Sequence, residues 1–231
     1  GALSFMALLG VLEMLGPAIA ERHGGTPWHA HHIAERYSLL VIITLGEVIL
    51  GTILAISAVV ESVGWSLEAA LVAFGGTTLA FAMWWVYFSI PVGRILHRHR
   101  DRAFSFGYIH VLLFGAIAAV GAGLHVAANV ISHEAHVDKV FAVLCVAVPV
   151  LIFLVVLAGI YTLLVREIDP LHFGLFAGSI VALVVAVLAV IFGASVGVAL
   201  VIVACAPIVV VVGYEVFGYK HQEEVLVRND A

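Results

Sequence analysis

Seven long apolar segments, separated by short polar connections, dominate the pattern along the chain. They cover residues 2–20, 36–60, 67–90, 105–132, 139–165, 171–192 and 195–218. A helix needs about 20 apolar residues to cross the hydrocarbon of a bilayer, and each segment has about that length or more. The pattern predicts an all-α fold, a polytopic transmembrane bundle of about seven helices. We expect one domain over residues 1–231, with a polar tail at about 219–231.

Prolines mark some of the predicted helix ends. Thr26-Pro27 suits an N-cap followed by the first helical position, which places the start of the second helix before the membrane. Asp169-Pro170 suits the same arrangement for the sixth helix. Pro149 and Pro207 fall inside the fifth and seventh segments, where they predict kinks.

Composition agrees with a membrane location. The chain is 64% hydrophobic and 11% charged, whereas a soluble domain carries about 25% charged residues. No tract of Lys and Arg with interleaved aromatics suggests nucleic-acid binding. The two cysteines, Cys145 and Cys205, lie in apolar runs without a CxxC pattern, so neither a disulfide framework nor a zinc ribbon is expected. The opening segment lacks a basic region and does not resemble a cleaved signal peptide.

The distribution of basic residues predicts the orientation, because Lys and Arg favour the cytoplasmic side. With the N-terminus outside and the C-terminus inside, the cytoplasmic connections hold Arg22, Arg94, Arg98, Arg100, Arg102, Arg166, Lys220 and Arg228. Arg36 lies at the inner end of the second segment, and only Lys139 falls outside. Next to the basic loop at 94–102, the side chains of Trp84, Trp85 and Tyr87 predict an aromatic belt at the membrane interface.

An acidic residue interrupts the second apolar segment. Glu47 lies about ten residues into the span, where a charged side chain costs at least about 2.5–3.5 kcal/mol. We therefore expect Glu47 to face the bundle interior, with Gly46 and Gly51 leaving room for neighbouring helices or water. Two interpretations remain open. The carboxyl group either bonds to a neighbouring helix and holds the bundle together, or titrates in a path for protons or cations.

At 100° per residue, polar residues of the same segment share a stripe with Glu47. His29, His32 and Arg36 lie on this stripe if the helix is continuous, whereas Glu35 points elsewhere. We expect Glu35 and Arg36 to fix the inner end of the helix by ion pairs, with His32 beside them.

The stretch "HHIAERYSLLVIITLGEVIL" resembles the signature of the low-temperature-requirement protein A family of bacterial membrane proteins. The matching positions are His32, Glu35, Arg36, Leu45, Gly46 and Glu47. "WWVYF" at 84–88, "YIH" at 108–110 and "LEMLGP" before the signature resemble further family elements in the same order. The resemblance covers most of the chain and implies a multi-pass bacterial membrane protein, but no particular reaction.

Two departures from the family pattern bear on function. The family usually places an acidic residue after the aromatic segment, where this chain has Ser89, so this chain lacks the acid for a polar path at that position. The family also usually has further N-terminal helices. The chain thus resembles the C-terminal two-thirds of such a protein, or a shortened relative.

The twelve histidines suggest no cofactor. Arginines surround His97 and His99 and disfavour a metal ion, and "HEAH" at 133–136 lacks the H-E-x-x-H spacing of a zinc protease. His110 and His125 lie on one helix, but no second helix carries the matching pair that two haems would need. The seventh segment has no lysine for a retinal Schiff base. We predict no cofactor, no metal site and no catalytic residue.

Proton or ion coupling is the function that these residues favour. The candidates for a proton relay are Glu47, Glu13 and His110. We expect transport or permeation of an unknown small ion or solute by a protein of the bacterial cytoplasmic membrane, whose partner is the lipid bilayer. A membrane sensor or assembly subunit with purely structural polar residues is the alternative, and an intramembrane enzyme ranks last. Whether the chain forms a homo-oligomer is left open.

Overall fold

The structure, a computed structural model, describes residues 2–20, 29–166 and 170–218. The described residues form helices joined by short turns. In chain order these are α1 (Ala2–Ala20), α2 (Ala30–Val63), α3 (Leu67–Phe88), α4 (Val92–Arg98), α5 (Ala103–Ile131), α6 (Lys139–Val165), α7 (Pro170–Ile191) and α8 (Val196–Gly213). A 3₁₀ turn, Arg100–Arg102, precedes α5, and a π-helical turn, Tyr214–Gly218, extends α8. The predicted all-α membrane bundle is confirmed.

The predicted segments match these helices closely, with one difference at the start of α2. The apolar run begins near residue 36, whereas α2 itself begins at Ala30 because its first turns are polar. This earlier start agrees with the predicted start of the helix before the membrane. Pro149 and Pro207 lie inside α6 and α8, and Pro170 is the first residue of α7, as predicted. The proposed caps Thr26 and Asp169 fall outside the described residues.

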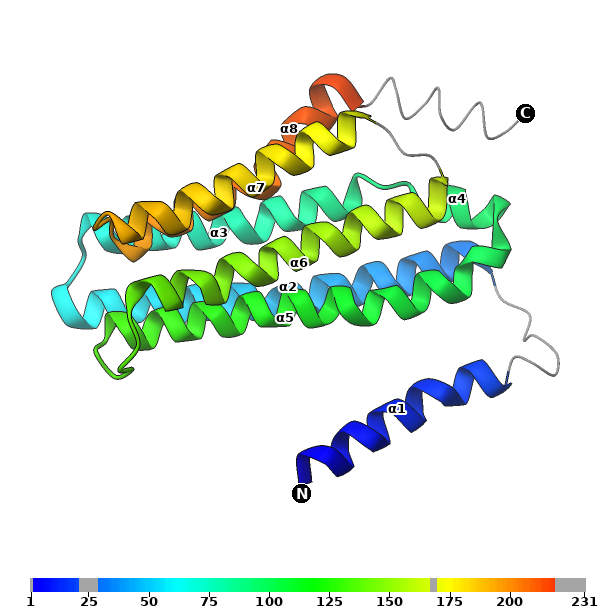
Figure 1. The fold of residues 1–231 in the computed structure, drawn as a ribbon, viewed down its shortest axis with the longest axis horizontal. Coiled ribbons are helices and arrows are strands. Elements are labelled where there is room, and N and C mark those ends of the chain that lie inside the picture. The colour runs from blue at the N-terminus through cyan, green and yellow to red at the C-terminus, as the bar shows by residue number, and fades with distance from the viewer. Residues whose placement is uncertain (1, 21–28, 167–169, 219–231) are drawn as a thin grey trace.

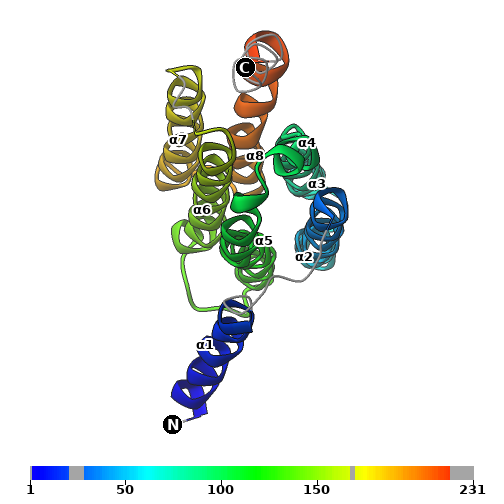
Figure 2. The same cartoon turned by 90° about the vertical axis from the view of Figure 1, so that its right-hand side faces the viewer.

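The long helices of the bundle run roughly alongside one another (Figure 1). The α7–α8 pair lies on one side, α2 and α5 lie on the other, and α3 and α6 lie between them. Six of the described helical stretches are long and apolar enough to cross a membrane, whereas α1 contains only a shorter apolar stretch, Ser4–Pro17. This helix lies outside the bundle in both views (Figure 2). The Tyr108 hydroxyl on α5 donates a hydrogen bond to the Met14 carbonyl of α1.

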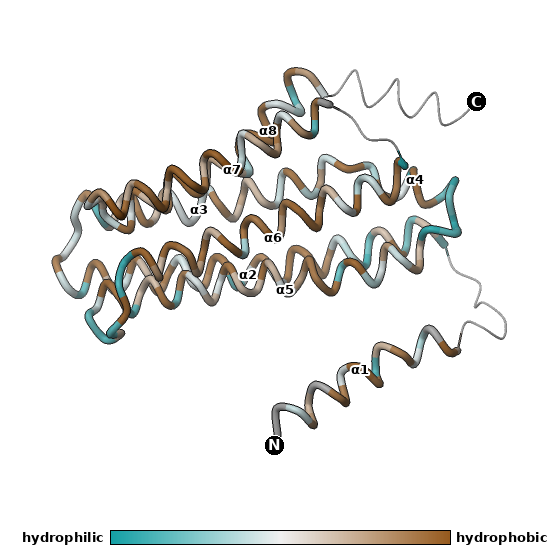
Figure 3. Tube along the Cα trace, viewed as in Figure 1, coloured by the Kyte–Doolittle hydropathy of each residue, from teal (hydrophilic) through white to brown (hydrophobic). Residues whose placement is uncertain are grey.

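Polar residues gather at the two ends of the bundle (Figure 3). The loop between α3 and α5 places Arg94, Arg98 and Arg100 at the same end as Arg166, while Lys139 begins α6 at the opposite end. The single described Lys of the chain is thereby separated from the arginine-rich end. This arrangement supports the predicted orientation, in which the arginine-rich end faces the cytoplasm. We call it the inner end below.

A carboxylate joins α3 to α8 at the outer end. The Glu68 Oε1 atom accepts a hydrogen bond from the Gly197 amide at 2.7 Å, across 129 residues of sequence. This amide belongs to the first turn of α8, where backbone N–H groups lack partners within the helix and favour a negative charge. A Cβ atom at Gly197 would come within 3.0 Å of the Glu68 carboxylate, so glycine permits this close approach. Sequence reasoning did not identify Glu68.

Candidate polar site between α2 and α5

His110 is fully buried where α2, α3 and α5 meet. Its Nδ1 atom lies 2.7 Å from the Phe106 carbonyl oxygen, and its Nε2 atom lies 3.1 Å from the Tyr87 hydroxyl. A carbonyl oxygen can only accept, so Nδ1 carries the proton, and Nε2 accepts the hydrogen bond that Tyr87 donates. Tyr37 packs its ring 4.8 Å from the imidazole, centroid to centroid. The neutral imidazole is therefore satisfied at both nitrogens.

The predicted aromatic belt needs one correction. The side chains of Trp84 and Trp85 are 41% and 49% exposed, which suits a lipid-facing position. Tyr87 is only 2% exposed and points toward His110. It therefore belongs to the bundle interior, although it lies only about 60° around α3 from Trp84.

Glu47 does not face the bundle interior, contrary to the sequence expectation. Its side chain is exposed at the edge of the α2–α5 contact, where its Cβ atom lies beside Gly121. The polar residues His32 and Arg36 of the same stripe are exposed as well. The buried face of α2 instead carries Val41 and Val48. The stripe therefore runs along the exposed edge of the α2–α5 contact and not through the bundle interior.

The two glycines near Glu47 also behave differently from each other. A Cβ atom at Gly51 would lie 2.7 Å from the Gly121 carbonyl oxygen and 2.8 Å from the Leu124 Cβ atom of α5. Gly51 therefore lets the two helices approach closely, as expected. A Cβ atom at Gly46 would have nothing within 4 Å, so Gly46 does not serve helix packing in this bundle.

His125 lies on α5 beside this close contact. Its Cδ2 atom is 3.2 Å from the position that a Cβ atom of Gly51 would occupy. Its Nε2 atom is buried and has no hydrogen-bond partner among the described residues. An ionisable side chain inside a predicted span is a sequence signal for such a residue.

The structure does not bring the three relay candidates together. Glu13 is exposed on α1, outside the bundle. Tyr37, which lies at the depth of His110, precedes Glu47 by ten residues, or about 15 Å along α2. The three groups therefore make no direct contact with one another in the described structure, although Glu47 and His110 border the same α2–α5 interface at different depths.

The signature residues at the start of α2 make surface contacts. The Nδ1 atom of His32 lies 3.9 Å from the Glu35 Oε2 atom, and both side chains are exposed, so this pair stabilises the helix little. The rings of His31 and His97 are 5.8 Å apart and bring α2 next to α4. Among the described residues, no three His, Cys, Asp or Glu side chains are grouped to hold a metal ion.

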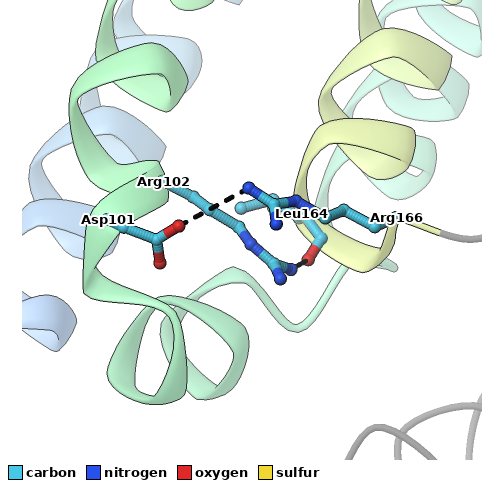
Figure 4. A network of polar contacts seen from close by, with 4 residues as sticks. All are labelled: Asp101, Arg102, Leu164 and Arg166. Carbon is cyan, nitrogen blue, oxygen red and sulfur yellow. Dashed lines mark hydrogen bonds and ion pairs between the residues drawn. The ribbon is translucent and has the colours of Figure 1, made fainter.

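At the inner end of the bundle, two arginines connect the start of α5 to the C-terminus of α6 (Figure 4). The buried Arg102 guanidinium donates a hydrogen bond to the Leu164 carbonyl, and Arg166 lies 3.5 Å from Asp101. Arg102 thereby satisfies a carbonyl of the last turn of α6, where carbonyls lack partners within the helix. Burial, followed by the positive charge of Arg102, lowers the pKa of the neighbouring His99 below its ordinary value of 6.5.

A half-open cavity of about 80 Å³ lies between α3, α6, α7 and α8 near the inner end. Its wall is mostly apolar, with polar atoms contributed by Ser89, Tyr161, His172 and Tyr214. The rings of Tyr161 and His172 stack with their centroids 4.4 Å apart. An apolar wall with a few convergent polar groups is typical of a small-molecule site.

Comparison with known proteins agrees with the signature, the fold and the distribution of polar residues. No curated protein and no solved structure matches the chain. The family model described as bacterial low temperature requirement A protein (LtrA) matches residues 2–211. Together with the six candidate membrane spans, this match shows a multi-pass bacterial membrane protein, and the chain belongs to the LtrA family.

Proposed function

We propose that this protein carries out proton- or ion-coupled transport or permeation of a small solute across the bacterial cytoplasmic membrane. One observation carries the proposal: Glu47, His110 and His125 all lie along the α2–α5 interface, at successive depths. Ionisable side chains are costly inside a membrane and usually serve proton or ion pathways. We therefore propose that protons bind to these three side chains along the α2–α5 interface.

His110 offers a physical link between protonation and helix contacts. Its neutral form accepts a hydrogen bond from Tyr87 through Nε2. A second proton on the ring turns Nε2 into a donor, so the Tyr87 hydroxyl must then rotate to accept. Protonation of His110 thus changes the hydrogen bond that joins α3 to α5, and such a change is what coupling requires.

The cavity at the inner end is the proposed position of the solute. It adjoins α3 through Val86 and Ser89, next to the helix position that carries Tyr87. A change in the α3–α5 contact therefore acts on the same helix that forms one wall of the cavity. The small volume and the apolar wall favour a small solute with one or two hydrogen-bonding groups.

Flux measurements on reconstituted protein test the proposal. Proteoliposomes with an internal pH-sensitive dye should acidify faster than empty liposomes under an imposed proton gradient. We expect His110→Gln and Glu47→Gln to lower this rate or shift its pH profile. His133→Gln is the matched control, because His133 is exposed in the outer loop between α5 and α6. Wild-type liposomes that behave like empty ones would refute the proposal, as would unchanged profiles in both test variants.

A membrane sensor or assembly subunit is the second candidate. Two observations favour it: the Glu47 carboxyl lies outside the bundle, and His110 is satisfied at both nitrogens. On this hypothesis, His110→Gln lowers thermal stability in detergent, and no variant alters proton flux. Measuring stability and flux on the same preparations separates the two candidates.

A further inference from the structure

Two polar groups without hydrogen-bond partners border the same contact between α2 and α5. Glu47 is exposed at the middle of α2, and no hydrogen bond or ion pair joins it to another described residue. The Nε2 atom of His125 is buried and has no hydrogen-bond partner within the same described part of the chain. An unpaired carboxyl in hydrocarbon and an unpaired buried nitrogen are both unfavourable. A hydrogen bond between the Glu47 carboxyl group and the His125 Nε2 atom would give both groups a partner.

The geometry of the helix pair places the two groups within one turn of each other. Tyr37 meets His110, and Gly51 meets Leu124, so the two helices run in the same direction. The Glu47 backbone lies against Gly121, one turn before His125 on α5. Gly51 lies one turn after Glu47 on α2, directly against the His125 ring.

Glycine at position 51 leaves the space between the two groups open. Cβ atoms four residues apart on a helix lie about 5–6 Å from each other. The His125 Cδ2 atom is 3.2 Å from the Cβ position that Gly51 leaves empty. A glutamate side chain that turns along α2 toward Gly51 therefore directs its carboxyl group toward the His125 ring.

We propose that Glu47 and His125 form one proton-binding site across the α2–α5 contact. The site closes when the Glu47 side chain rotates toward Gly51. With its proton bound, the pair is neutral overall: the carboxyl donates to Nε2, or the proton moves to Nε2 and the imidazolium donates to the carboxylate. When the proton leaves, the pair carries one negative charge. The desolvation cost of a charge is therefore avoided when the pair binds its proton.

Other titratable groups on the packed helices lie at a distance from this pair. In the described parts of the chain, Glu61 lies toward the end of α2, and Glu68 lies at the outer end of α3. His110 lies on α5, about 22 Å toward the inner end. On α6, Cys145 meets α5 through its backbone, at Gly123. The pair can therefore form whether or not the protein supports flux.

A double-mutant cycle tests the pair. The unfolding equilibrium constants of Glu47→Leu, His125→Phe and the double variant are measured in bicelles by steric trapping, in the full chain. Because each single change leaves one polar group without a partner, we expect the double variant to be about tenfold less destabilised than the product of the single effects predicts. The control cycle combines Glu47→Leu with His133→Phe in the outer loop, where the effects should multiply. Multiplicative effects in the test cycle would overturn the proposal.

Infrared spectroscopy supplies a second readout that stability does not determine. The Glu47 carboxyl band in bilayers is identified by its loss in Glu47→Gln. We expect His125→Phe to shift this band and His110→Phe to leave it in place. A carboxyl band that does not shift in His125→Phe would overturn the pair. A Glu47→Leu variant that changes the oligomeric mass without energetic coupling to His125 would also overturn it, and would indicate that another copy of the chain packs against Glu47. Absent flux with intact coupling would refute only the transport proposal.

Discussion

Alanine substitutions at Gly51 and Gly46 should have opposite effects on stability, although the two glycines lie on the same helix. At Gly51 the new Cβ would lie 2.7 Å from a carbonyl oxygen and 2.8 Å from the Leu124 Cβ atom. Optimal contacts between carbon atoms are about 3.5–4.0 Å, so α2 and α5 must separate. Overpacking of this kind costs about 1–3 kcal/mol. At Gly46 nothing lies within 4 Å, and alanine gains up to about 1 kcal/mol of helix propensity.

The comparison between the two variants isolates the steric cost. Both gain the same propensity, so the difference between their free energies of unfolding should be about 1–3 kcal/mol, with Gly51→Ala the less stable. Steric trapping in bicelles, or unfolding titrated with SDS and followed by tryptophan fluorescence, measures this difference. Equal stabilities of the two variants would refute the close α2–α5 contact, as would a more stable Gly51→Ala.

Three further changes test other contacts in the bundle. Tyr87→Phe should lower the free energy of unfolding by about 1–3 kcal/mol, because it leaves the buried His110 Nε2 atom without a partner. Tyr37→Phe, which changes another tyrosine beside the same histidine, should cost less. Equal losses in the two variants would contradict the Tyr87–His110 hydrogen bond. Glu68→Gln should destabilise by about 0.3–1 kcal/mol by removing the charge at the start of α8, and a melting temperature equal to that of the wild type would argue against it. His99 has a lowered pKa, so its contribution to stability is present above about pH 6.5 and is lost as the pH falls through its folded-state pKa. Melting temperatures measured from pH 7.5 to 5 should therefore fall less for His99→Gln than for the wild type. Parallel curves for the two proteins would exclude this role.

Hydropathy predicted the membrane helices well because the length of an apolar run is set by the thickness of the bilayer. It located the ends of α3 and α6 to within about two residues. The apolar run alone begins later than α2, because polar residues such as His31 and Glu35 continue the helix outside it; the Thr26-Pro27 pair predicted that earlier start. Apolar length marks the membrane, whereas helices also extend into water.

The side of α2 that faces the bundle could not be predicted in the same way. A helical wheel shows which residues share a face, but lipid is as apolar as the protein interior. Val48 on the inner face and Ile43 on the outer face are equally hydrophobic choices. The polar stripe through Glu47 was therefore identified correctly, and its direction was not. Packing against Gly121 of α5 decides that direction, and a single sequence does not show which helices become neighbours.

The Glu68–Gly197 hydrogen bond has a consequence for biogenesis. Chains are synthesised from the N-terminus, so α3 exists long before the amide that its carboxylate accepts. Until α8 is made, this acid and the facing groove at Gly75, where Leu200 and Val201 later pack, remain unfilled. Assembly of the bundle can therefore be completed only after the final hairpin has emerged from the ribosome.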